Sequence, residues 1–95
     1  MLGKELLELK ITAQFRKDLK RMVKRKLNIG LLDEIVQALR EQRPLGTKHH
    51  DHALTGDHAG FRECHIQPDW LLIYFIDGKK LVLTASRTGS HSDLF

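Results

Sequence analysis

Seven consecutive aromatic or aliphatic residues, Trp70–Ile76, constrain the fold more than any other feature of the sequence. A short apolar run with aromatic and β-branched side chains is typical of a strand that is buried on both faces. A membrane-spanning helix needs about 20 apolar residues, so this run is too short to cross a bilayer. We therefore expect Trp70–Ile76 to form the central strand of a sheet, with one strand on each side.

The flanking segments have the pattern of those neighbouring strands. Residues 61–66 alternate along the chain, which places successive side chains on opposite faces of a strand. Pro68-Asp69 and Asp77-Gly78 have the composition of tight turns, and residues 80–86 supply the third strand. One face of the 61–66 strand is predicted to hold Phe61, Glu63 and His65, and the other Arg62, Cys64 and Ile66.

The N-terminal half predicts one strand followed by two helices. Leu7, Leu9 and Ile11 alternate with charged residues, as in a half-buried strand. Thr12 is a suitable N-cap for a helix that runs to about Leu27. The apolar stripe of this helix is predicted to consist of Phe15, Leu19, Met22, Val23 and Leu27.

A second helix is predicted from Leu31 to about Gln42. Gly30 can take the left-handed conformation that ends the first helix, and Pro44 stops the second. Two helices joined by a short turn are expected to form an antiparallel hairpin on the sheet. The order βααβββ therefore predicts an α+β fold, with an antiparallel sheet and both helices on one face. The 95 residues are expected to form a single domain, residues 1–95.

The two halves of the chain differ in charge. Residues 1–48 contain 12 Lys and Arg against 6 Asp and Glu, whereas residues 49–95 contain 4 against 6. A basic half indicates a polyanionic partner such as RNA, although a solvated helix face accounts for the same charges. The candidate contacts to RNA all lie in the first predicted helix: Arg16, Lys17, Lys20, Arg21, Lys24 and Arg25.

All six histidines follow residue 48, in a half of the chain that also contains a long polar loop, residues 45–60. Imidazole titrates near neutral pH, so this distribution points to proton-transfer chemistry. A polar loop of this length in a small domain is usually functional or mobile. The loop contains His49, His50, His52 and His58.

The candidate catalytic residues come from four separate segments: His52, His65, Asp69 and His91. If the strands pair as predicted, His65 lies one turn from Asp69 and the C-terminal tail returns to the same end of the sheet. Imidazoles beside a carboxylate can supply the acid and the base for RNA cleavage, in which the RNA 2′-hydroxyl is the nucleophile. Arg62 and Arg87 are candidate phosphate-binding cations, because a guanidinium pairs with phosphate through two hydrogen bonds.

Each of these residues also has a purely structural interpretation. The histidines can be packing, solvated or tail-anchoring groups, and Arg62 can pair with a glutamate on the surface. Trp70 opens the apolar strand, which makes a core position more common for it than a base-stacking one. Phe95 is too close to the C-terminus to build a core element, which favours docking into a site or a groove.

A metal site is the main chemical alternative, because histidine and cysteine are zinc ligands. The sequence has no Cys-x-x-Cys or His-Glu-x-x-His motif, and its one cysteine, Cys64, should point away from His65 on a strand. We therefore expect no metal and no cofactor. One cysteine without a secretory pattern favours the cytoplasm. The potential ligands considered are His49, His50, His52, Cys64 and His65.

Three motifs, in this order, resemble the YafQ-type mRNA interferase toxins of bacterial toxin–antitoxin systems, in the RelE/ParE superfamily. They are Asp51-His52-x-Leu54-x-Gly56, Gly60-Phe61-Arg62-x-x-His65-x-x-Pro68-Asp69-Trp70-x-Leu72-Ile73-Tyr74, and Arg87-x-Gly89-x-His91-x-x-Leu94-Phe95. The resemblance covers the chain from about Leu9. It implies a RelE-like fold and a small ribosome-associated endoribonuclease. Relatives often carry an aromatic residue between Gly56 and Gly60, so His58 has no implied role.

The resemblance also implies roles for individual residues. His91 would be the general acid and Asp69 or His52 the base, with His65 in support. Its aromatic site residues would be Trp70 and Phe95, and its basic residues near the phosphate would be Arg62 and Arg87.

The implied partners are mRNA, the ribosome with its rRNA, and a cognate antitoxin that silences the toxin. The toxin would be a monomer within a larger toxin–antitoxin complex. Two alternatives remain open: a non-catalytic ParE-like toxin that binds DNA gyrase, and a generic RNA-binding module. The histidine set with Asp69 favours the enzyme, because a protein that only binds has no need of it.

Overall fold

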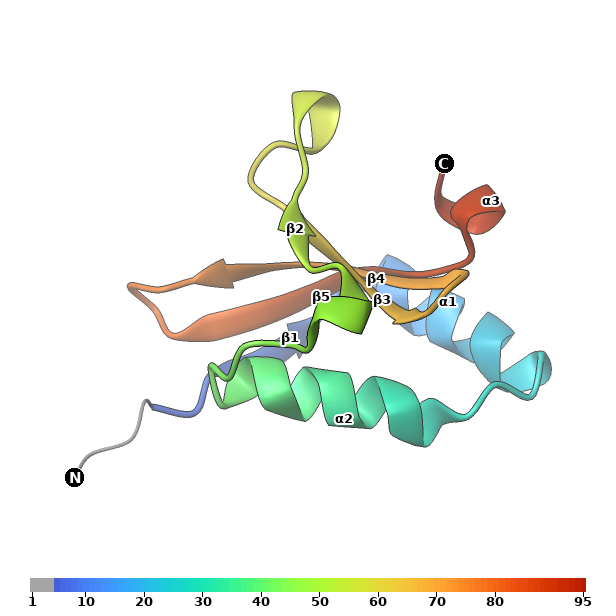
Figure 1. Cartoon of the computed structure of the whole chain (residues 1–95), viewed down its shortest axis with the longest axis horizontal. Helices are drawn as coiled ribbons and strands as arrows, with labels where there is room; N and C mark the ends of the chain where they lie inside the picture. Colours follow the sequence, from blue (N-terminus) through green and yellow to red (C-terminus); the bar gives the residue numbers. More distant parts are fainter. Residues whose placement is uncertain (1–4) are drawn as a thin grey trace.

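A five-stranded sheet with the strand order β1-β5-β4-β3-β2 organises the protein (Figure 1). The computed structural model describes residues 5–95, so the first four residues of the predicted domain lie outside the described part. The strands are β1 (Glu8–Ile11), β2 (His52–Ala53), β3 (Arg62–Gln67), β4 (Trp70–Asp77) and β5 (Val82–Gly89). The helices are α1 (Ala13–Lys24), α2 (Ile29–Arg40) and the short C-terminal α3 (His91–Leu94), with single 3-10 turns η1 (Thr47–His49) and η2 (Gly56–His58).

The central strand is β4, as the apolar run predicts. It pairs with β3 on one side and β5 on the other, antiparallel in both cases. In this register Ile73 lies between Glu63 and Arg87, and Leu71 lies between His65 and Gly89. The predicted α+β fold and the order βααβββ are confirmed, with the two-residue β2 as an addition at the β3 edge.

One strand pair differs from the predicted antiparallel sheet. β1 runs parallel to β5, with Leu9 opposite Leu83. Parallel neighbours require a long crossover, and here the two helices and the β3–β4 hairpin separate β1 from β5 along the chain. β1 is also more exposed than a half-buried strand: Leu7 just before it is fully buried, whereas Leu9 and Ile11 are each 38% exposed.

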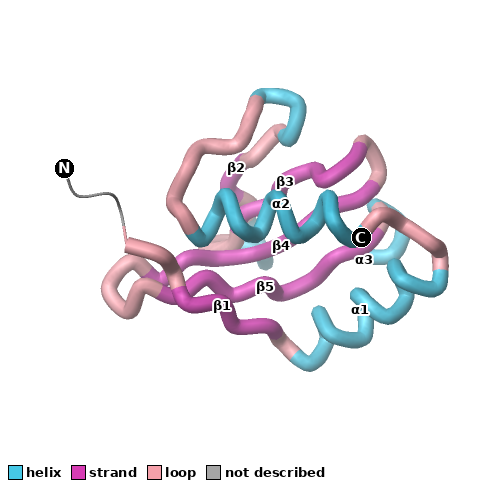
Figure 2. The backbone as a smooth tube through the Cα atoms, turned by 90° about the horizontal axis from the view of Figure 1, so that it is seen from below, coloured by secondary structure: helices cyan, strands magenta, loops and turns pink. Residues whose placement is uncertain are grey.

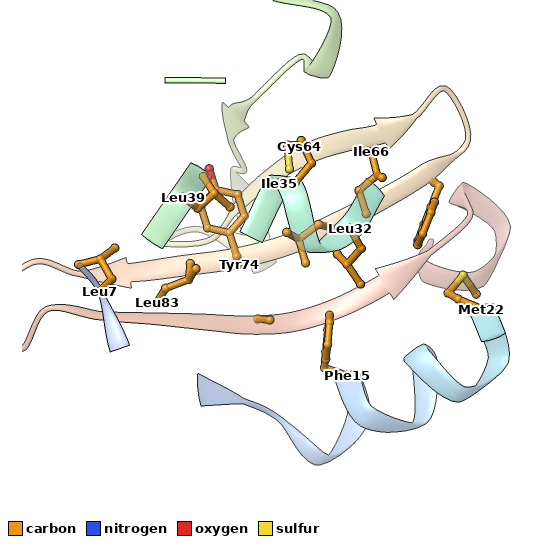
Figure 3. Close-up of a cluster of buried hydrophobic side chains, with 13 residues drawn as sticks. Leu7, Phe15, Met22, Leu32, Ile35, Leu39, Cys64, Ile66, Tyr74 and Leu83 are labelled. Atoms are coloured by element: carbon orange, nitrogen blue, oxygen red, sulfur yellow. The ribbon is translucent and has the colours of Figure 1, made fainter. Parts of the chain in front are cut away.

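Both main helices pack their apolar residues onto the same face of the sheet. The shared core contains Phe15 and Met22 from α1, Leu32 from α2, and Cys64 and Tyr74 from the strands (Figure 3). Burying these side chains is the main stabilising contribution to a domain of this size. α2 crosses β3 and β4, whereas α1 lies beside β5 (Figure 2).

The helix ends follow local capping. Thr12 caps α1 as predicted, since its side chain accepts a hydrogen bond from the Phe15 amide. The left-handed residue after α1 is Lys26, with φ 63°, and not Gly30 as expected. Gly30 lies inside α2, because Asn28 caps that helix by accepting from the Gly30 amide.

The inward face of α1 also differs from the predicted apolar stripe. Asp18 is fully buried together with Phe15 and Met22, whereas Val23 is 55% exposed. Residues three and four apart share one side of a helix, so positions 15, 18 and 22 form the buried line. The single acidic residue of a basic helix therefore faces the protein interior.

The second face of the sheet carries neither α1 nor α2. The loop with β2 and η2, and the C-terminal helix α3, rise on this side, away from α2 (Figure 1). We call it the open face. In the described part of the chain, no helix is long and apolar enough to span a membrane.

Candidate active site

His91 and Asp69 form a hydrogen-bonded pair on the open face. The Asp69 carboxylate oxygen Oδ1 lies 2.6 Å from His91 Nδ1, and it accepts a hydrogen bond from the His91 backbone amide at 2.9 Å. The two hydrogen bonds from His91, first from the backbone amide and then from the ring, lower the pKa of Asp69 below its usual value. Asp69 is thus an ionised partner that orients His91, and its basicity is reduced.

A second group of three residues lies along β3 and the adjoining loop. Glu63 is 7% exposed, and its Oε1 lies 3.6 Å from His52 Nε2 and 3.7 Å from His65 Nε2. The ring centroids of His65 and His91 are 5.6 Å apart. His65 therefore connects the Glu63 group with the Asp69–His91 pair, and the structure brings all four predicted catalytic residues to one face.

Hydrogen bonds to backbone carbonyls define the tautomers of two histidines. His52 Nδ1 lies 2.6 Å from the His50 carbonyl oxygen, and His65 Nδ1 lies 3.2 Å from the Pro68 carbonyl oxygen. A carbonyl oxygen only accepts, so both Nδ1 atoms donate. In the neutral rings each Nε2 then keeps its lone pair and can accept a proton.

The neighbouring histidines support this arrangement. His49 Nδ1 donates to the His65 backbone carbonyl oxygen at 2.7 Å, which ties the loop to β3. The His50 ring lies edge-on to His65, with centroids 5.4 Å apart. His58 lies farther along the loop and packs edge-on against Phe95, at 5.7 Å.

Arg87 is held by a buried carboxylate. Its Nε donates to Asp18 Oδ2 at 2.7 Å and its Nη2 donates to Asp18 Oδ1 at 3.2 Å. Asp18 also accepts from the Gln14 side chain and the Thr88 amide. Burial alone would raise the pKa of Asp18, but these hydrogen bonds and the charge of Arg87 outweigh it and lower that pKa. Arg87 therefore has a fixed position at the edge of the open face.

Arg62 is not brought to the histidines. Its Nη2 donates to Asp51 Oδ2 at 3.2 Å, and the same carboxylate accepts a hydrogen bond from the Tyr74 hydroxyl. Arg62 pairs with Tyr74 across the strands, and Tyr74 belongs to the core under α2. Strand alternation places Arg62 on the opposite face from His65, so the predicted phosphate contact by Arg62 lacks support from the geometry.

The two predicted aromatic site residues differ in accessibility. Trp70 is 2% exposed, belongs to the core, and donates its indole N–H to Thr88 Oγ1 at 2.9 Å. The prediction that Trp70 contacts substrate directly is therefore corrected to a core position. Phe95 is 61% exposed and lies beside His58, where a base can reach it.

The basic helix α1 divides into two groups of cations. Arg25 forms two hydrogen bonds with Asp93 of α3, at 2.6 and 2.9 Å, and Arg21 lies 3.7 Å from the same carboxylate. Arg21 and Arg25, which were predicted to contact RNA, therefore hold α3 in place through Asp93. Within residues 5–95, no ion pair is found for the exposed side chains of Arg16, Lys17, Lys20 and Lys24.

The single cysteine takes no part in this site. Burial raises the pKa of the Cys64 thiol to about 12, with smaller contributions from Asp51 and Glu63. A thiol that is protonated at neutral pH is a poor nucleophile and a poor metal ligand. Among the described side chains, no group of three or more His, Cys, Asp or Glu is arranged to hold a metal ion.

Sequence reasoning missed three functional or supporting carboxylates. Glu63 lies two positions before His65 on the same strand, so strand alternation alone predicts that their side chains share one face. Asp18 follows Phe15 by three positions, so helix periodicity places it on the same buried side of the helix. Asp93 meets Arg25 across 68 positions of sequence, and no local pattern reveals such a contact.

Comparisons with known proteins identify relatives of nearly the whole chain. The sequence model of the family described as "Bacterial toxin of type II toxin-antitoxin system, YafQ" matches residues 7–95. The mRNA interferase toxin YafQ of Escherichia coli strain K12 is 35% identical over 89 residues, which cover 93% of this chain and 95% of that protein.

Solved structures of related toxins are similar to this chain in both sequence and fold. A metal-bound toxin from Helicobacter pylori is 42% identical, with a TM-score of 0.89, over 95% of this chain and 100% of that one. A chain of the E. coli DinJ–YafQ toxin–antitoxin complex is 33% identical, with a TM-score of 0.85, over 95% of this chain and 98% of that one.

The fold is shared with bacterial toxins of type II toxin–antitoxin systems. Within that class, the chain belongs to the YafQ toxin family. The predicted family is confirmed.

Proposed function

We propose that this protein is the toxin of a type II toxin–antitoxin pair and an mRNA interferase, an endoribonuclease that cuts mRNA on the ribosome in the cytoplasm. The supporting observation is the line of groups on the open face, from the Asp69–His91 pair through His65 to Glu63 and His52. A relative named as an mRNA interferase toxin is 35% identical over 93% of this chain.

In the proposed reaction the RNA supplies its own nucleophile. His52 Nε2 takes the proton of the 2′-hydroxyl, and the 2′-oxygen attacks the adjacent phosphorus. The bond from phosphorus to the 5′-oxygen breaks, and His91 Nε2 gives that oxygen its proton. The products are a 2′,3′-cyclic phosphate and a 5′-hydroxyl. General acid–base catalysis of this kind needs no metal ion, because no external nucleophile has to be activated.

The geometry assigns different roles to the carboxylates. His91 acts as an acid in its imidazolium form, in which both ring nitrogens carry a proton. Asp69 accepts the hydrogen bond from Nδ1–H, so the proton on Nε2 is the one given to the leaving oxygen. Glu63 is buried beside the Nε2 atoms of His52 and His65, so its carboxylate stabilises the positive charge that His52 gains when Nε2 takes the proton. Arg87 is the cation for the phosphate, since Asp18 fixes its guanidinium at the edge of the same face. We therefore choose His52 over Asp69 as the base.

The experiment that tests this function is cleavage of a defined mRNA on programmed ribosomes. The expected products end in a 2′,3′-cyclic phosphate on one fragment and a 5′-hydroxyl on the other. Fragments that end in a 3′-hydroxyl and a 5′-phosphate would contradict this chemistry. Binding of mRNA without any product would instead support the generic RNA-binding module.

The partners in this proposal are mRNA, ribosomal RNA and a cognate antitoxin. DinJ forms a toxin–antitoxin complex with the E. coli YafQ, which supports an antitoxin for this chain. The exposed cations of α1 support a contact to ribosomal RNA, because phosphate contacts by Lys and Arg supply most non-specific affinity for nucleic acids.

Reversing the charge of Lys17, Lys20 and Lys24 should weaken ribosome binding without unfolding the protein. These side chains are exposed and form no ion pair in residues 5–95, so only the long-range attraction to phosphate is lost. We expect a loss of at least about tenfold in affinity at physiological salt and a shallower salt dependence. The check is ribosome co-sedimentation at several salt concentrations. As a control, the same reversals at Lys79 and Lys80, in the β4–β5 turn, should have little effect.

A further inference from the structure

A small groove lies on the open face beside the candidate active site. It has a volume of about 210 Å³, and it is bounded by the loop before β3, by β4 and β5, and by α3. Its lining residues are His58, Phe61, Ile73, Ser86, Arg87 and Leu94. None of the roles assigned above uses His58, and the family resemblance implies none for it.

The groove lies on strands and a helix that also carry residues of the candidate active site. Its floor residue, Ile73, is paired with Glu63 on one side and Arg87 on the other. Its wall residue Leu94 lies in the same helical turn as His91. A molecule in the groove would therefore contact Arg87, the proposed phosphate cation, and would lie near the helical turn that carries His91.

The chemistry of the groove suits one flat, partly apolar ring system. Ile73 is 4% exposed and gives an apolar floor, and Arg87 places a fixed cation at the side. At the entrance, the rings of His58 and Phe95 stand at 85° to each other, with centroids 5.7 Å apart. A planar ring can stack on one of these rings while it meets the edge of the other. Pockets for drug-sized ligands have volumes of about 300–1,000 Å³, so this groove fits a smaller group.

We propose that the groove binds one nucleobase of the RNA, next to the scissile phosphate, and that His58 determines which base is preferred. This proposal rests on the proposed ribonuclease function. Unpaired RNA bases are recognised by stacking on aromatic side chains and by hydrogen bonds to their edges. Phe95 and Ile73 supply contacts that any base can make. The His58 ring nitrogens supply a hydrogen bond that only some bases can match.

The first test is a map of cleavage sites on a defined mRNA on programmed ribosomes. His58→Ala removes the base contact and leaves His52, His65, Asp69 and His91 in place. We expect the preference for one base beside the cut to fall by about five- to tenfold, as for the loss of one hydrogen bond to a base edge. Asp57→Ala is the control, because Asp57 is the exposed neighbour that does not line the groove. An unchanged base preference in His58→Ala would overturn the proposal.

A second test does not depend on cleavage. Each of the four nucleoside 3′-monophosphates is titrated into the protein, and the NMR signals of the Ile73 and Leu94 methyl groups are followed. The proposal is supported if a nucleotide changes the chemical shifts of both residues and if these changes are smaller in His58→Ala. This result would support base binding in the groove even if no mRNA were cut and the ribonuclease function failed. If the Ile73 and Leu94 signals do not move with any of the four nucleotides, the groove proposal is wrong, whatever the cleavage assay shows.

Discussion

Replacing His91 by alanine should reduce mRNA cleavage by about 10²- to 10⁴-fold, the usual contribution of a positioned general acid. The variant removes the imidazole that Asp69 orients at 2.6 Å, and the leaving 5′-oxygen then has no proton donor. The measurement is the single-turnover cleavage rate on programmed ribosomes, because product release then does not mask the chemical step.

The fold should survive this change. The His91 side chain is 53% exposed, so its loss removes little buried surface, and the unfolding midpoint should stay close to that of the native protein. Ser92→Ala is the matched control, since Ser92 lies in the same turn and bonds only to Ser90 in residues 5–95. A His91→Ala protein that cleaves at the native rate would exclude His91 as the acid.

Replacing Asp18 by alanine should destabilise the protein by about 3 kcal/mol, near the lower end for breaking a buried ion pair. Asp18 is 0% exposed and accepts four hydrogen bonds, from Gln14, twice from Arg87, and from the Thr88 amide. Its removal leaves the guanidinium of Arg87 without its carboxylate. Urea unfolding of the native and variant proteins gives the difference in free energy.

The pH dependence supplies a second readout for Asp18. Its pKa is lowered in the folded state, so the unfolded chain binds more protons below its ordinary value of 3.8. The stabilisation by Asp18 is therefore present above that pH and is lost as the pH falls through the lowered native value. Asp18→Asn should make the decline in stability at acid pH shallower. The exposed Asp33→Asn is the control, and equal slopes for all three proteins would contradict this account.

Most of the fold could be predicted because local patterns specify it. The apolar run of β4, the alternation of β3 and the Thr12 cap each depend on neighbouring residues. The parallel pairing of β1 with β5 depends on two segments more than 70 positions apart, and no local pattern encodes it. The prediction that Gly30 is the left-handed residue that ends α1 was wrong. Asn28 caps α2, so Gly30 lies inside that helix, and Lys26 is the left-handed residue after α1.

The candidate site was predictable as a set of residue types and less so as a set of contacts. The four acid–base residues meet on one face because strand register and the returning tail bring them there. The same alternation that placed Glu63 beside His65 also placed Arg62 on the far face, so Arg62 could have been set aside from the sequence. The partners of Arg87 and Arg25 lie across 69 and 68 positions, and only the folded chain shows them.

The central claim is that the RNA 2′-hydroxyl is the nucleophile and that the histidines move its proton. The most direct test compares the cleavage of two mRNAs on programmed ribosomes. The two mRNAs differ only in that one has a 2′-deoxy nucleotide immediately 5′ of the mapped cleavage site. The account predicts cleavage of the all-ribose mRNA and no product at that position from the deoxy mRNA, because the attacking oxygen is missing. Cleavage of both mRNAs at the same bond and a similar rate would show that the nucleophile comes from elsewhere and would contradict the account.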